Sequence, residues 1–518
     1  MVGKLKFELK TFMNLEYRKQ QLTAIKQTDF DVAIIGGGIS GAAIFNHLAL
    51  KGYRILLVDK GDFAGGTSQS SAMMAWANIH DLRKLSFIKI ARLCASRERL
   101  IRDRAEWVVP RSFRYLPTSA VGRKPFVSYL ALYTYWLLGA GRRSIPHYQK
   151  DFSELAFLER EKFPYSFDYQ EAALEPSDAR FVLGWILEQQ NCAEQIALNY
   201  CLLQGGRYSS ADKHWHLEIF DSIFETETVV KAKCVINAAG VWTDRLNQQF
   251  GIKSPYKHAF GKGVFIGINR PASHNSTLMV ETVEYEGNLG LIPWGPISLW
   301  GTTETRVTNP EDGFSIEPSD VQFLIKELNR HLSKPISTQD IVSLRCGVRP
   351  LSVNVSAVET GETIGIPREY KIYADKEIPW ISIYGGKITS CVSAAESVDR
   401  LLQQFRLKPN RIPPTAPTFD VSTPELEDFP TLDEKVLSAN YCAEKEMCWT
   451  LDDYLRRRTN ISQWVARGGL GLNNENLQHL TDIARIFCDN DDAKANLAIN
   501  AYKQKIKREF DELLANVN

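Results

Sequence analysis

Three glycines and an aspartate near the N-terminus have the types and spacing that bind a dinucleotide. Gly36, Gly38 and Gly41 form G-x-G-x-x-G, and Asp59 follows 18 residues after the last glycine. Such glycines let the backbone approach a pyrophosphate at the N-terminus of a helix, and the carboxylate accepts hydrogen bonds from a ribose hydroxyl. The four residues therefore predict a bound dinucleotide.

A strand, a turn, a helix and a second strand must position these residues. Residues 30–62 read FDVAIIGGGISGAAIFNHLALKGYRILLVDKGD, in which two apolar runs flank the glycine turn and an amphipathic stretch that ends at Gly52. This is the pattern of a βαβ unit. A lone G-x-G-x-x-G is a weak signal, but the strand before it, the helix after it and the acid that ends the second strand make it specific.

Two later segments repeat the pattern of a strand followed by glycine, and they favour FAD over NAD. KCVINAAGVWTD (233–244) and ISIYGGKITS (381–390) each read as a buried strand and a tight turn. We expect both to approach the same cofactor, the second at the O2 edge of a flavin ring; an ordinary strand-to-helix turn is the alternative for each. The residues expected at the cofactor are Ala239, Gly240, Gly385, Gly386 and Thr389.

The composition describes an ordinary globular protein of about two to four domains. The chain has 518 residues, of which 44% are hydrophobic and 24% charged, and a net charge of +1. This balance gives no reason to expect a polyanionic partner, so nucleic acid is not expected. The nine cysteines contain no C-x-x-C pair and are odd in number. They favour a reducing compartment over a disulfide framework, and they predict no metal site.

The first 28 residues are polar, with six Lys or Arg against two Glu and no apolar core of a signal peptide, so we expect a cytoplasmic protein. The longest apolar run, FVSYLALYTYWLLGAG (126–141), is shorter than the ~20 residues that span a bilayer. Basic residues flank it at 123–124 and 142–143. We prefer to interpret it as a buried core helix; the alternative is a helix in the membrane interface on the cytoplasmic side.

Short β-rich runs alternate with helical stretches in the middle of the chain, which predicts the α/β class. We expect a Rossmann-like FAD-binding domain, an interleaved antiparallel-sheet substrate domain and an all-helical C-terminal domain. The predicted parts are an N-terminal extension (1–28), an FAD-dependent oxidoreductase region (29–408), a Pro-rich linker (409–430) and the helical domain (431–518). Within the second part, the FAD domain takes about 29–90, 175–260 and 340–408, and the substrate domain about 91–174 and 261–339.

With these motifs, the chain resembles the FAD-dependent glycerol-3-phosphate dehydrogenases, within the wider group of D-amino-acid-oxidase-like flavoproteins. The segments that carry the resemblance are IIGGGISGAAI, GGTSQSS, SDARFVL, INAAGVWTD, SPYKHAFGKG, WGTTET, CGVRPL, IYGGKITS and EMCWTLDDYLRRRT. The resemblance implies FAD and the oxidation of a phosphorylated secondary alcohol, with hydride passing to flavin N5. The first two segments add Ser40, Thr67, Ser68 and Ser71 to the expected cofactor contacts.

A phosphorylated alcohol requires a cationic pocket and a base that accepts the hydroxyl proton. Arginine is the best bidentate partner of a phosphate, and lysine acts as a point charge. Arg349 in GVRPL and Lys387 in GGKIT match the substrate-side cations of the family. We therefore assign these two residues to anion binding and charge stabilisation near the flavin.

The stretch AMMAWANIHDL (72–82) departs from the family pattern. His80 and Asp81 occupy the positions of a substrate-contacting Arg and Tyr in the family. Trp76 is the first residue of the segment that has the sequence H-G-G in the family, and Phe265 replaces a histidine. We therefore expect a pocket that is less cationic and more apolar than in the family. His80 is kept as a candidate catalytic residue because histidine titrates near neutral pH, although a lone histidine is more often structural.

Three functions stay open at this point. A glycerol-3-phosphate dehydrogenase, with a small anionic substrate and with quinone or oxygen as acceptor, agrees with the motifs. An FAD-dependent oxidase or dehydrogenase for another hydroxy or amino acid agrees with the substitutions, and a flavin-binding protein without turnover is the third. The resemblance also implies a peripheral membrane contact, and a homodimer is a separate expectation. The basic LRRRT (455–459) is interpreted as a solvated or inter-domain helix face rather than a lipid contact.

Overall fold

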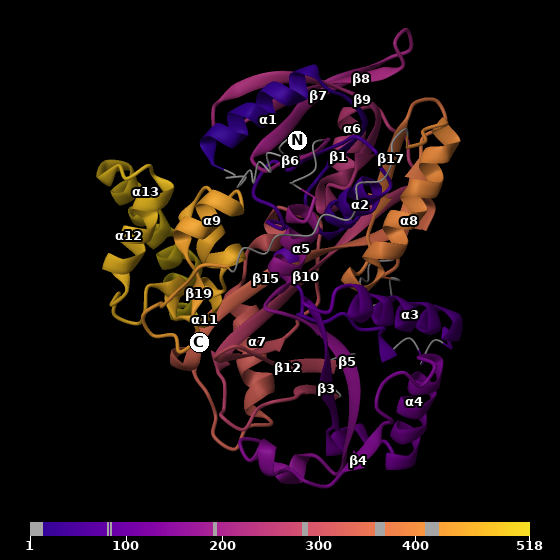
Figure 1. The fold of residues 1–518 in the computed structure, drawn as a ribbon. Coiled ribbons are helices and arrows are strands. Elements are labelled where there is room, and N and C mark those ends of the chain that lie inside the picture. Colours follow the sequence, from indigo (N-terminus) through magenta and orange to yellow (C-terminus); the bar gives the residue numbers. More distant parts are fainter. Residues whose placement is uncertain are drawn as a thin grey trace, which may run out of the picture.

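Two large sheets and a group of C-terminal helices make up the protein (Figure 1). The computed structural model describes residues 14–79, 82, 85–189, 194–281, 288–357, 368–409 and 424–517. The architecture is mixed α/β, as the sequence predicts. Much of the Pro-rich linker lies outside the described residues, as do His80 and Asp81.

The first sheet contains the predicted βαβ unit. Its strand order is β16-β17-β9-β1-β2-β6, and β8 and β7 extend it from β9. Neighbours from β17 to β6 run parallel, as in a Rossmann-like sheet. The strands are β1 (Asp29–Ile35), β2 (Ile55–Val58), β6 (Gln195–Leu198), β7 (Cys201–Ser209), β8 (His214–Asp221), β9 (Thr226–Asn237), β16 (Lys371–Ala374) and β17 (Trp380–Tyr384).

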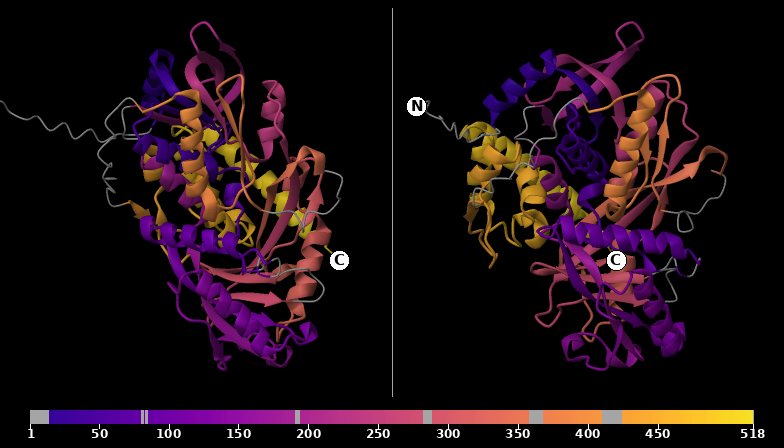
Figure 2. Two further views of the ribbon diagram at one scale, coloured as in Figure 1. Left: turned by 90° about the vertical axis from the view of Figure 1, so that its right-hand side faces the viewer. Right: turned by 45° about the vertical axis from the view of Figure 1, so that its right-hand side comes forward.

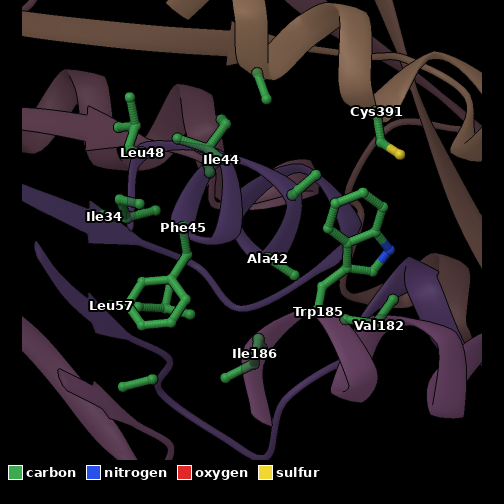
Figure 3. Close-up of a cluster of buried hydrophobic side chains, with 14 of the residues drawn as sticks. Ile34, Ala42, Ile44, Phe45, Leu48, Leu57, Val182, Trp185, Ile186 and Cys391 are labelled. Carbon is green, nitrogen blue, oxygen red and sulfur yellow. The ribbon is translucent and has the colours of Figure 1, made fainter. Parts of the chain in front are cut away.

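Helices pack on both faces of this sheet and form its core. Helices α2 (Ile39–Leu50), α5 (Asp178–Leu187) and α8 (Cys391–Leu402) share one cluster of buried side chains with β1 and β2 (Figure 3). Helix α1 (Leu15–Gln27) packs Leu22 and Ile25 into a second cluster, and α6 (Thr243–Gln249) adds Leu246 to it. Because both faces are covered, β2 and β17 are buried along their whole length.

The second sheet has the order β14-β10-β13-β12-β11-β3-β5-β4, with β15 paired to β10. One pair, β11 with β3, is parallel, so the sheet is mixed rather than purely antiparallel. Its strands are β3 (Val108–Pro117), β4 (His147–Gln149), β5 (Ser166–Leu174), β10 (Tyr256–Asn269), β11 (Thr277–Glu281), β12 (Asn288–Trp294), β13 (Ile297–Gly301), β14 (Thr305–Val307) and β15 (Ile341–Asn354). The prediction placed 340–408 in the FAD domain, but β15 pairs with β10 along nearly its whole length.

Three helices accompany the second sheet: α3 (Phe87–Asp103), α4 (Pro125–Leu138) and α7 (Pro318–Asn329). Helix α7 packs Val321, Leu324 and Leu328 against the sheet. The preferred interpretation of the apolar run as a core helix is wrong, because α4 buries only Ser128, Leu132 and Tyr135. Four of its apolar residues, Phe126, Val127, Leu130 and Leu137, are exposed.

The C-terminal helices lie on the side of the molecule opposite to α8 (Figure 2). They are α9 (Ala439–Lys445), α10 (Leu451–Asp453), α11 (Ile461–Trp464), α12 (Leu477–Phe487), α13 (Asp492–Ile506) and α14 (Glu512–Ala515). A two-stranded ladder of β18 (Leu426–Glu427) and β19 (Val436–Leu437) precedes them, so the region after residue 431 is not entirely helical.

The basic LRRRT segment is an inter-domain contact. Arg457 and Arg458 are buried, and both donate hydrogen bonds to the carboxylate of Asp62, at 2.6 and 2.7 Å. Burial alone raises the pKa of Asp62, but the two arginines bring it down to about 2. Arg456 reaches the same loop, where it donates to the carbonyl oxygen of Gln69. The C-terminal helices therefore hold the loop that follows Asp59.

Candidate active site

Residues from both sheets line a cavity of about 1430 Å³. Its wall includes nearly all the site residues predicted from the sequence: Gly36, Gly38, Ser40, Asp59, Thr67, Ser68, Ser71, Ala239, Gly240, Arg349, Gly385, Gly386, Lys387 and Thr389. Gly41 lies behind the wall, in the first turn of α2. The structure therefore brings together segments that are more than 300 residues apart in the chain.

The glycine turn forms a backbone cradle at the start of α2. Gly36 has a φ of +110°, and a Cβ atom there would lie 2.5 Å from the carbonyl oxygen of Ala238. A Cβ atom on Gly41 would lie 1.8 Å from the carbonyl oxygen of Gly36. The hydroxyl of Ser68 accepts a hydrogen bond from the N–H of Ile39 at 2.9 Å, which fixes the turn from the outside. The cradle and the helix N-terminus fit the pyrophosphate of a dinucleotide.

Asp59 holds the glycine turn and faces the cavity. Its carboxylate accepts hydrogen bonds from the N–H groups of Gly37 (2.6 Å) and Gly61 (2.9 Å). Burial raises the pKa of Asp59 to about 6, and the two backbone donors oppose that rise. Each carboxylate oxygen has a second lone pair, so Asp59 can also accept from ribose hydroxyls.

A second glycine turn, at 385–386, meets the cavity from the end of β17. The N–H of Gly385 donates to Nε2 of His258 at 3.1 Å, and Nδ1 of His258 lies 3.3 Å from Asp244. The hydroxyl of Thr389 donates to the carbonyl oxygen of Trp76 at 3.0 Å. His258 lies within the segment SPYKHAFGKG but is not among the residues predicted for the site, and its buried ring supports the turn expected at the flavin.

Cationic side chains gather at one end of the cavity. Arg349 donates to the hydroxyl of Thr302 at 2.9 Å, and Arg368 forms an ion pair with Glu304. Lys387 lines the same cavity. Arg368 and Glu304 were missed, although WGTTET was recognised as a motif. Lys89 and Glu369, which form an ion pair at 3.2 Å, line the cavity as well, so cationic and anionic side chains are mixed here.

Apolar side chains complete this end of the cavity. Trp76 and Phe265 line it, as do Met74 and Met279. No histidine lines the cavity among the described residues. His80, the candidate base, and Asp81 lie outside them, so their predicted roles stay predictions. In the same described part of the chain, no group of three or more His, Cys, Asp or Glu could hold a metal ion.

Comparisons with known proteins agree with this geometry. Residues 31–364 match the model of the DAO family, described as FAD dependent oxidoreductase. Aerobic glycerol-3-phosphate dehydrogenase of Escherichia coli is 28% identical over 375 residues, which cover 71% of this chain and 72% of that protein. D-erythritol 1-phosphate dehydrogenase of Brucella abortus is 26% identical over 385 residues, covering 71% and 72%.

Among solved structures, the glycerol-3-phosphate dehydrogenase from Bacillus halodurans complexed with FAD superposes with a TM-score of 0.70 at 19% sequence identity. The superposition covers 96% of this chain and 99% of that chain. It supports the fold over nearly the whole chain, including the C-terminal helices.

Proposed function

Because the chain belongs to the DAO family of FAD-dependent oxidoreductases and FAD is its cofactor, we propose that it oxidises the secondary alcohol of glycerol 3-phosphate. The observation that carries the proposal is the group of Arg349, Arg368 and Lys387 in one cavity with the glycine cradle. Guanidinium groups bind phosphate in a bidentate manner, and a lysine adds a point charge. Similarity to named dehydrogenases of phosphorylated alcohols supports the same substrate class.

Bound FAD supplies a two-electron acceptor for the hydride of the alcohol carbon. The protein would hold its pyrophosphate at the Gly36–Gly41 turn and its ribose at Asp59. The turn at 385–386, supported by His258, would lie at the flavin. Arg349 and Arg368 would hold the substrate anion, while the rings of Trp76 and Phe265 exclude water and so strengthen these contacts. Quinone or oxygen would take the electrons in turn.

A different hydroxy or amino acid is the second candidate substrate. The apolar wall of Trp76 and Phe265 favours it, because a carboxylate needs fewer cations than a phosphate dianion. Arg349 alone could hold such a carboxylate.

The deciding experiment mixes FAD-loaded protein with glycerol 3-phosphate under anaerobic conditions and follows the visible absorbance of the oxidised flavin. We expect bleaching, because hydride transfer reduces the flavin. Dithionite serves as the control that the flavin can be reduced at all. Bleaching by dithionite but not by glycerol 3-phosphate would refute this substrate and direct attention to other hydroxy and amino acids.

Helix α4 exposes an apolar surface, and we propose that this surface lies on the cytoplasmic face of an anionic membrane. Figure 1 shows the helix at the edge of the molecule, next to α3. Phe126 is 72% exposed, and Leu130 and Leu137 are 51% and 54% exposed. Lys124 and Arg142 are exposed at its two ends, and no acidic residue occurs between them. Apolar side chains bordered by basic ones fit the interface of a bilayer with anionic lipids. No helix among the described residues has the length and apolar character needed to cross a bilayer.

The double variant Phe126→Ser and Leu130→Ser is expected to bind vesicles of phosphatidylglycerol about tenfold more weakly than the unmodified protein, because two apolar anchors are lost. Cosedimentation at low salt measures the fraction of each protein bound to the vesicles. Leu497→Ser is the matched control, because Leu497 on α13 is also 72% exposed. Equal binding by all three proteins, or equal binding to neutral vesicles, would contradict this contact. A homodimer stays a prediction.

A further inference from the structure

One carboxylate oxygen of Glu304 is buried in the cavity wall without a hydrogen-bond partner. The side chain of Glu304 is 5% exposed, and its Oε2 accepts from Arg368. Its Oε1 is buried, and no described residue donates to it. Both Glu304 and Arg368 line the cavity. Leaving a buried charged acceptor unsatisfied is costly, so this oxygen is suited to a donor that arrives with a ligand.

The backbone around Glu304 is fixed, so this acceptor has a defined position. The N–H of Val264 on β10 donates to the hydroxyl of Thr303 at 2.9 Å. The hydroxyl of Thr302 accepts from Arg349. The segment that follows β13 therefore presents Glu304 beside the guanidinium groups of Arg349 and Arg368. Because Arg368 contacts Glu304 directly, an anion bound at Arg368 would lie beside this carboxylate.

We propose that Glu304 Oε1 accepts a hydrogen bond from a substrate hydroxyl other than the one that is oxidised. The substrate class is then a phosphorylated polyol, which carries an anion, a secondary alcohol and at least one further hydroxyl. This inference rests on the proposed function and makes it more specific. A simple hydroxy acid without a second hydroxyl would leave Oε1 unsatisfied in the complex, and a site built to bind a hydroxyl discriminates against analogues that lack it.

The test compares glycerol 3-phosphate with its 1-deoxy analogue, the phosphate of propane-1,2-diol, which keeps the phosphate and the secondary alcohol. The measured quantity is the second-order rate constant for anaerobic bleaching of the bound flavin. The unmodified protein is expected to react about 10- to 100-fold more slowly with the analogue, the range of a hydrogen bond to a charged group. In Glu304→Ala this ratio should fall to about 1, because neither substrate finds the acceptor.

Two further variants keep the test decisive. Glu304→Gln keeps an acceptor oxygen and should retain part of the preference for glycerol 3-phosphate over the 1-deoxy analogue. It replaces Glu304→Ala in the test if the alanine variant fails to fold or to bind FAD. Glu154→Ala, at an exposed glutamate far from the cavity wall, should keep the full preference. The FAD absorbance of each variant, recorded before mixing, reports whether the cofactor site is intact.

The outcomes separate this proposal from the one on which it rests. If glycerol 3-phosphate bleaches the flavin but the unmodified protein treats both substrates alike, or Glu304→Ala keeps the preference, the role of Glu304 is refuted and the dehydrogenase stands. If Glu304→Ala slows both substrates equally, the carboxylate acts on the oxidised hydroxyl and the proposal is also refuted. If neither substrate bleaches the flavin, both proposals fall.

Discussion

Replacing Arg349 by methionine is expected to lower the second-order rate constant for flavin reduction by glycerol 3-phosphate about 1000-fold, with FAD still bound. Arg349 lines the cavity, and its guanidinium group is held there by a hydrogen bond to the hydroxyl of Thr302. Removing one partner of a desolvated charge pair costs about 2–5 kcal/mol, and about 4 kcal/mol corresponds to this factor. Methionine keeps the length and much of the apolar volume of the side chain while it removes the charge.

Arg349→Lys is the control for this variant. Lysine keeps a positive charge but loses the planar fork, so we expect a loss of about 10- to 100-fold rather than 1000-fold. Stopped-flow absorbance over a range of substrate concentrations measures both rate constants. A methionine variant that reduces its flavin as fast as the unmodified protein would remove Arg349 from the substrate site.

Gly41→Ala is expected to weaken FAD binding at least about 100-fold and to lower the free energy of unfolding by about 3 kcal/mol. The added Cβ atom would lie 1.8 Å from the carbonyl oxygen of Gly36, which no backbone can tolerate without moving. Overpacking of this kind typically costs 1–3 kcal/mol and here must displace the turn that cradles the pyrophosphate. The FAD content after purification, a fluorescence titration with FAD and thermal unfolding measure the effect.

Gly61→Ala is the matched control for Gly41→Ala. Gly61 lies near the same cofactor loop, but a Cβ atom there would meet nothing within 4 Å. Its N–H donates to Asp59, and that bond survives the substitution. We therefore expect near-normal FAD content. Equal loss of FAD in both variants would mean that any alanine in this region weakens FAD binding. That result would contradict the steric explanation.

The residues expected at the cofactor can be chosen from the sequence because their signals are local, and the structure places nearly all of them on one cavity wall. Each of these signals follows a strand within a few residues: the glycine turn, Asp59 and the turn at 385–386. Such motifs can be recognised without knowledge of the tertiary structure. The substrate half depends on pairing between distant strands. Glu304 follows β13, and Arg368 precedes β16 in the other sheet, so their ion pair has no signature in the order of residues.

Two features of the fold carry little signal in the sequence. β15 lies between segments of the predicted FAD domain in the sequence, but it pairs with β10. The alternation of apolar and polar residues along one strand does not specify which strand it pairs with. The apolar run at 126–141 fits a buried helix and a helix with one exposed face equally well by its composition. The assignment of the parts of the chain to domains stays a prediction for this reason.

The contact between the C-terminal helices and Asp62 makes two binding events interdependent. Asp59, expected at the ribose, and Asp62, held by Arg457 and Arg458, belong to one short loop. When the C-terminal helices order this loop, the entropic cost of binding FAD falls. Bound FAD in turn favours the contact with the helices, because such coupling is reciprocal. A fragment that lacks the C-terminal helices would therefore have a lower affinity for FAD, even though it retains every predicted cofactor contact.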